Sequence, residues 1–131
     1  MVGKMKSKII VIVYVGSLVG SVSATERMFA YLTSDLKSRG HIIKYSNNSK
    51  VIFEDGTKIS KIRIGEPIGR ATHVYIDDNI LDIGNGVKFV NEAVIPSMIK
   101  GDKYKLLDAE SDVYERITVF NSTETSKYEK E

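Results

Sequence analysis

Two short stretches of the sequence hold the residue types best suited to chemistry. The first is GSLVGSVS at residues 16–23, a glycine- and serine-rich turn directly before a predicted helix. The backbone amides of such a turn, together with the positive end of the helix dipole, bind anions such as phosphate. The second is the acidic group Asp77, Asp78 and Asp82, whose carboxylate oxygens suit a divalent cation. Acidic residues at the end of a strand are also ordinary turn formers, and this alternative stays open.

Alternating strands and helices must position these stretches. The apolar, β-branched run at 9–15 is typical of a buried strand. A helix is predicted from 24 to 39, with Ser23 and Glu26 forming a capping box at its start and Gly40 ending it. Its apolar face consists of Met28, Phe29, Leu32 and Leu36.

The next segments extend the same pattern. HIIKYSN at 41–47 completes a strand–helix–strand unit, so this second strand is expected to lie parallel to the first in one sheet. Residues 50–64 predict a β-hairpin with Asp55 and Gly56 in a type I′ turn. THVYIDD at 72–78 predicts a strand tipped by two acids.

The remaining third of the chain predicts one more helix and two strands. Residues 79–86 read as a loop and 87–100 as a helix that Pro96 kinks or restarts. Its apolar side is Phe89, Val90, Ala93 and Val94. Two strands are predicted at 103–109 and 114–120.

The fold class that follows is a single α/β domain over residues 1–120 with a polar tail at 121–131. A mainly parallel central sheet carries the first, the second and the acid-tipped strand. Helices flank this sheet, and the β-hairpin lies at one edge.

The order of these motifs resembles the P-loop NTPase core, and more narrowly the ATPase domain of viral DNA-packaging motors, the large terminases. The similar stretches are YVGSLVGSVSATERMFAYL, FEDGTKI, GRATHVYIDD and NEAVIPSMIKGDKYKLLDA, which follow one another as that family's motifs do. The resemblance spans roughly residues 8–112. It implies a three-layer fold. No cofactor is expected, and ATP or GTP with Mg²⁺ would be ligands if the nucleotide-binding alternative given below holds.

The resemblance also implies site residues. Asp77 takes the Walker B place, which holds Mg²⁺ through water, and Asp78 takes the place of the catalytic Glu. The candidate nucleotide-binding residues are Gly16, Gly20, Ser21 and Ser23.

The sequence departs from the family at the Walker A loop, whose pattern is G-x-x-x-x-G-K-[ST]. Ser21 stands at the lysine position and Val22 at the hydroxyl position, and the spacing from Gly16 to Gly20 is one residue short. The family's lysine binds the phosphates and its hydroxyl binds Mg²⁺. Efficient hydrolysis is therefore not expected.

Composition narrows the remaining function classes. The chain has 131 residues, with 27% charged and 42% hydrophobic, which is globular composition. The lack of cysteine excludes disulfides and cysteine-based zinc sites, and two histidines leave little for a histidine metal site. A net charge of +2 does not by itself favour nucleic acid. Contacts to a phosphate backbone are a candidate role for Lys58, Lys61 and Arg63, whose other interpretation is the solvent face of a strand.

Residues 1–24 admit a second interpretation as a secretion signal. Lys4, Lys6 and Lys8 precede an apolar run, and VSA at 22–24 has the small residues of a cleavage site, so a secreted domain beginning after cleavage near Ala24 is an alternative. The run is short for a membrane span, which needs roughly 20 residues. The buried strand is favoured because glycines and serines within the run are spaced as a turn.

The function expected from the sequence is a non-enzymatic accessory protein with a P-loop-like fold. It is expected to be encoded by a virus or other mobile element, to act in the cytoplasm, and to bind a protein partner through the hairpin or an edge strand. The alternative is a nucleotide-binding protein or weak NTP hydrolase that uses the 16–23 loop with Asp77 and Asp78.

Overall fold

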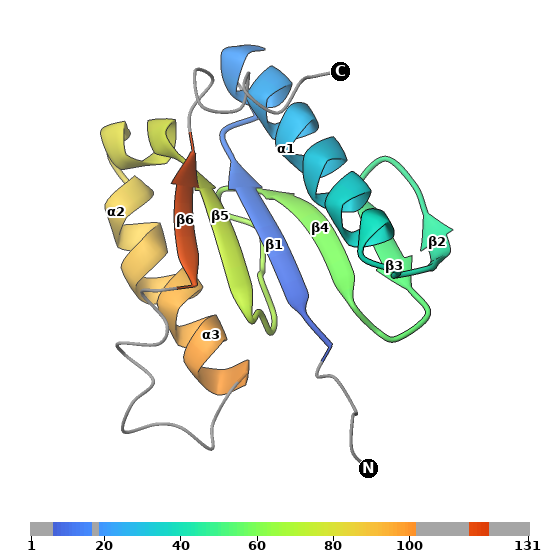
Figure 1. Cartoon of the computed structure of the whole chain (residues 1–131). Helices are drawn as coiled ribbons and strands as arrows, with labels where there is room; N and C mark the ends of the chain where they lie inside the picture. Colours follow the sequence, from blue (N-terminus) through green and yellow to red (C-terminus); the bar gives the residue numbers. More distant parts are fainter. Residues whose placement is uncertain (1–6, 17–18, 102–115, 121–131) are drawn as a thin grey trace.

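A six-stranded mixed sheet forms the centre of the protein, in the strand order β2-β3-β4-β1-β5-β6 (Figure 1). The computed structural model describes residues 7–16, 19–101 and 116–120, with the backbone alone for 19–23 and 99–101. The strands are β1 (Ile9–Tyr14), β2 (Ile43–Ser46), β3 (Lys50–Phe53), β4 (Lys58–Arg63), β5 (His73–Asp77) and β6 (Ile117–Phe120). β1 pairs in parallel with β4 and β5, and β5 with β6, whereas β2–β3 and β3–β4 are antiparallel. The mainly parallel α/β class predicted from the sequence is confirmed.

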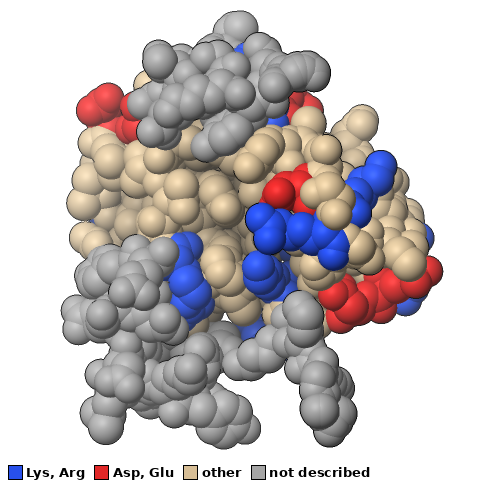
Figure 2. All heavy atoms as spheres, viewed as in Figure 1, with Lys and Arg blue, Asp and Glu red and all other residues tan. Residues whose placement is uncertain are grey.

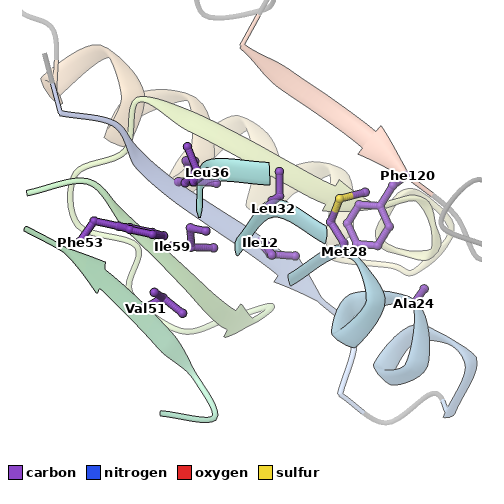
Figure 3. Packing of buried hydrophobic residues seen from close by; sticks show 10 residues of the cluster. Ile12, Ala24, Met28, Leu32, Leu36, Val51, Phe53, Ile59 and Phe120 are labelled. Carbon is purple, nitrogen blue, oxygen red and sulfur yellow. The ribbon is translucent and has the colours of Figure 1, made fainter. Parts of the chain in front are cut away.

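Helix α1 (Val19–Ser38) covers one face of the sheet (Figure 1). The apolar face predicted for it is confirmed, since Met28, Leu32 and Leu36 are buried against Ile12 and Ile59 of the sheet (Figure 3). The helix ends at Gly40 as predicted. The Gly40 φ is +97°, and the amides of Gly40 and His41 bond to the carbonyls of Lys37 and Leu36.

The start of α1 differs from the prediction. The helix begins at Val19, five residues before Ala24, so Ser23 lies inside it and the predicted capping box is wrong. The Glu26 carboxylate pairs instead with the ammonium of Lys61 on β4. The side chain that the local pattern assigned to a helix cap therefore forms an ion pair with a residue distant in sequence.

The other face of the sheet is covered by one helical stretch. It follows the 3-10 helix η1 (Asp78–Asp82) and comprises α2 (Gly86–Phe89), the π-helical turn η2 (Val90–Val94) and α3 (Ile95–Gly101). The loop predicted at 79–86 is thus partly helical. Pro96 neither breaks nor restarts the stretch: just before it, the Ile95 amide bonds five residues back to Val90. Of the predicted apolar side, Val94 is fully buried, and Phe89 and Val90 pack against the same core.

The second predicted strand lies in the sheet but not beside the first. β2 occupies one edge, and β4 takes the place next to β1, so the β-hairpin is not at the edge as predicted. The reason is burial on both faces. β4 carries Ile59 in one core and Ile62 against the other, whereas β2 has a single half-buried side chain, Ile43, against a core. A strand flanked on both sides needs apolar residues facing both ways.

The turn of the β3–β4 hairpin is confirmed in position but not in type. Gly56 has a φ of +93°, but Asp55 does not have the positive φ that type I′ requires. The Gly56 amide bonds to the Phe53 carbonyl, and the Phe53 amide to the Thr57 carbonyl, which gives a three-residue loop. The strand predicted at 103–109 and the tail at 121–131 lie outside the described residues.

Candidate functional site

The carboxyl ends of the parallel strands bring three polar side chains into one row. Tyr14 of β1 pairs with Arg63 of β4, and the β1–β5 register places Asp77 next to Tyr14 on its other side. Side chains alternate along each strand, so all three lie on the face that α1 covers. The row therefore sits beneath the first turns of α1.

This row lies at a reversal of chain direction. The connection after β1 runs over one face of the sheet through α1, and the connection after β5 runs over the other face through α2 and α3 (Figure 1). In α/β sheets, the crevice between two such strands is where ligands bind. The predicted loop and acid pair are thus brought to the place where a nucleotide site is expected.

The predicted phosphate loop is described only in part. Gly16 follows β1. Gly20, Ser21 and Ser23 lie in the first turns of α1, where the structure describes the backbone alone. Residues 17 and 18 are outside the described residues. The structure adds a cation that sequence reasoning did not place here: the Arg63 side chain lies against Gly16, where an added Cβ would be 2.7 Å from Arg63 Cδ. Only the strand order could have revealed this neighbour, because β4 was predicted away from β1.

The buried Asp77 carboxylate accepts hydrogen bonds from a residue two positions later in the sequence. The residue is 1% exposed, and its Oδ1 accepts hydrogen bonds from the backbone amide and from Nδ2 of Asn79, at 3.0 and 3.1 Å. It thereby caps η1. Asp78 is the half-buried first residue of η1, and Asp82 is exposed at its end. Within the described residues, no three side chains of His, Cys, Asp or Glu gather as a metal site.

The two histidines and Lys61 have partners of their own. His73 Nδ1 lies 2.8 Å from the Thr72 hydroxyl, and His41 Nδ1 lies 3.0 Å from Asp55 Oδ2. The Lys61 side chain is 8% exposed, pairs with Glu26 and lies over the Phe29 ring, so it no longer shares a surface with Lys58. On the face seen in Figure 2, several basic side chains adjoin one another right of centre, with acidic side chains beside them.

A groove of about 690 Å³ opens on the α2 side of the carboxyl edge. Apolar side chains and a few charged ones line it, among them Ile64, Ile83, Phe89, Glu66 and Lys88. This volume is in the range of small-molecule sites. The groove faces away from the Gly16 loop, on the other side of the sheet.

In the part of the sheet farthest from α2 and α3, no described helix covers the face opposite α1. Pairing of Tyr45 with Ile52, and a register shift between Ile43 and Tyr45, put Ile42 and Tyr45 on the side opposite α1. Their side chains are 60% and 49% exposed. Ile52 belongs to neither hydrophobic core. We call this the open sheet face, and it consists of Ile42, Tyr45, Lys50, Ile52 and Lys58.

Comparison with protein-family models and with curated proteins finds no match. Among solved structures, the large terminase from a thermophilic bacteriophage is similar, with a TM-score of 0.40 and 14% sequence identity. The alignment covers 89% of this chain and 33% of the terminase chain. A likeness at this TM-score carries no argument about activity. In the described part of the chain, no helix is long and apolar enough to cross a membrane.

Proposed function

We propose that this chain is a protein-binding accessory domain without catalytic activity, and that its partner docks on the open sheet face. The observation that carries this is the exposure of Ile42 and Tyr45, which lie together on a sheet face that no described helix covers. Clustered apolar side chains on a surface mark sites of protein interaction. The motif order supports the further proposal that a virus or other mobile element encodes the protein.

The lack of catalysis is supported by Asp77. A Walker B acid acts by holding Mg²⁺, whereas this carboxylate is buried and accepts two hydrogen bonds from Asn79. The Walker A lysine and hydroxyl are replaced by Ser21 and Val22. Electrostatic stabilisation of the transferred phosphoryl group would therefore lack its main contributors.

The backbone of the edge strand β2 is not the proposed docking site. β2 has four residues, a register shift and an exposed lysine, Lys44. These are the features by which proteins prevent strand addition at an edge. The partner is therefore proposed to contact side chains of the face, not the backbone of β2.

The test is photocrosslinking in the cells that produce the protein. A photoreactive phenylalanine analogue replaces Tyr45 in one variant and Val87, an exposed apolar residue of α2, in the control. We expect a discrete protein adduct from position 45 and none from position 87. Equal adducts at both positions, or none at position 45, would contradict docking on the open sheet face.

A nucleotide-binding function is the second candidate, and the position of Arg63 favours it. The Arg63 side chain lies against Gly16, the first residue of the predicted phosphate loop, at the carboxyl edge of the sheet. ATP or GTP with Mg²⁺ would then bind at Gly16, Gly20, Ser21 and Ser23, with Asp77 and Asp78 nearest the metal. Millimolar nucleotide would raise the melting temperature of the wild type and not of Arg63→Ala. The accessory-domain proposal expects no shift in either.

A further inference from the structure

The charged residues within the strands of the open sheet face are of one sign, whereas the exposed Glu54, which follows β3, lies beside Ile42 at its rim. Strands β2, β3 and β4 contain no acidic residue. Their basic residues are Lys44, Lys50, Lys58, Lys61 and Arg63. Among these five cations, Lys61 alone forms an ion pair with a described acidic residue, and it does so on the face that α1 covers.

On the α1 side, the two cations are Lys61 and Arg63. Lys61 pairs with Glu26, and its ammonium lies 4.7 Å from the centre of the Phe29 ring. The Arg63 side chain lies against Gly16, which precedes α1. Neither side chain is directed to the open sheet face.

On the opposite side, the lysines surround the apolar residues without acidic partners. Ile52 pairs with Tyr45 on one side and with Lys58 on the other, so the three form a row across the sheet. The Lys50 ammonium lies 5.9 Å from the centre of the Tyr45 ring. No described residue forms an ion pair with Lys50 or Lys58.

We propose that the partner on the open sheet face is an acidic protein segment with large apolar side chains; this rests on the proposed function. The apolar residues would lie on Ile42, Tyr45 and Ile52, and the carboxylates would pair with Lys50 and Lys58. Complementary charge of this kind selects the partner and speeds association. Nucleic acid is disfavoured because the centre of the face is aliphatic and because Lys61 is directed to the other face.

The test uses two synthetic peptides and amide NMR spectra of the full chain. One peptide is rich in Glu and Phe, and the other has Lys in place of every Glu. We expect the acidic peptide to shift amides of β2, β3 and β4 and to bind at least about tenfold more tightly than the basic one. The double variant Lys50→Glu/Lys58→Glu is expected to reverse this preference. Arg70→Glu, an exposed loop change, is the matched control and should leave it unaltered.

Each other outcome has a defined meaning. Equal binding of both peptides at the open sheet face would overturn the acidic partner and leave the docking proposal standing. Binding of the acidic peptide elsewhere, or not at all, would overturn the inference, and the Tyr45 crosslink would then decide the docking proposal. Tighter binding of a single-stranded oligonucleotide, with steep salt dependence, would replace the protein partner by nucleic acid. The neutral variant Lys50→Gln/Lys58→Gln shows whether a lost preference reflects charge or misfolding.

Discussion

Asp77 and Asn79 are joined by two hydrogen bonds at the end of β5: one carboxylate oxygen of Asp77 accepts from both the backbone amide and the side-chain amide of Asn79. The same carboxylate that resembles a metal ligand in the sequence is thus buried and capping η1 in the structure. The two roles predict different responses to substitution and to Mg²⁺.

Replacing Asp77 separates these roles. Asp77→Ala leaves the donors of the half-buried Asn79 without this acceptor, and we expect it to lower the free energy of unfolding by about 1–3 kcal/mol. Asp77→Asn keeps an acceptor oxygen, and Asn caps helices about as well as Asp, so it should cost less than the Ala variant. Urea denaturation measures both changes. A melting temperature that Mg²⁺ raises in the wild type but not in Asp77→Asn would restore the metal-ligand role.

Gly86 is required by the backbone of η1. A Cβ at Gly86 would lie 1.6 Å from the carbonyl oxygen of Ile80, and that backbone atom cannot move away as a side chain would. Gly86→Ala is therefore expected to destabilise the protein by about 3 kcal/mol. Gly84→Ala is the matched control: no atom lies within 4 Å of its added Cβ, and the change should stay within about 1 kcal/mol. Similar costs at both positions, measured by urea denaturation, would contradict the arrangement of η1 and α2.

At Gly16, an added Cβ would meet a side chain instead of the backbone. The nearest atoms to an added Cβ are Cδ and Nε of the exposed Arg63 side chain, which has room to rotate. We expect Gly16→Ala to fold with a free energy of unfolding within about 1 kcal/mol of the wild type. The cost should disappear in an Arg63→Ala background, which a double-mutant cycle measures. An equal loss in both backgrounds would show that the Gly16 backbone, not Arg63, resists the change.

Asp55 makes stability depend on acid pH. The Thr57 backbone amide donates to Asp55 Oδ1 at 2.9 Å and lowers the pKa of the Asp55 carboxyl, with smaller contributions from the Thr57 hydroxyl and from His41, while desolvation opposes them. A lowered folded-state pKa adds stability above the unfolded-state value, about 3.9, and this is lost as the pH falls through the folded value.

The variant Asp55→Asn removes this titration and keeps an acceptor for the Thr57 amide. We expect its stability to fall less steeply than that of the wild type as the pH drops below about 4. Urea denaturation at a series of acid pH values measures both slopes. Parallel slopes would show that the Asp55 carboxyl titrates alike in the folded and unfolded chains.

Sequence pattern located most elements because their signals are local. The apolar face of α1 follows from the spacing of Met28, Leu32 and Leu36, and the stop at Gly40 follows from a residue that adopts positive φ at little cost. Patterns that depend on two elements together were misread. Ser23 and Glu26 have the capping-box spacing, but the Lys61 ammonium competes for the Glu26 carboxylate from a strand distant in sequence.

The candidate site shows the same division. Sequence spacing predicted a glycine turn after the first strand and an acid pair after the fifth, and the strand order places the carboxyl ends of β1 and β5 side by side. Whether Asp77 is available to a metal depends on burial and on Asn79, which the two letters DD do not encode. The neighbour Arg63 and the exposure of Tyr45 both depend on where β2 and β4 sit in the sheet.

The amino-acid sequence by itself determined the α/β class, the apolar faces of the helices and the absence of a Walker lysine, because each depends on residue type and short-range periodicity. The tertiary structure alone decided which strands are neighbours, which side chains share a surface and which carboxylates are buried. Those features result from the competition of distant segments for the same buried positions. β4 took the place beside β1 because it carries an isoleucine for the core on each face, and β2 was left at the edge with Ile42 and Tyr45 exposed.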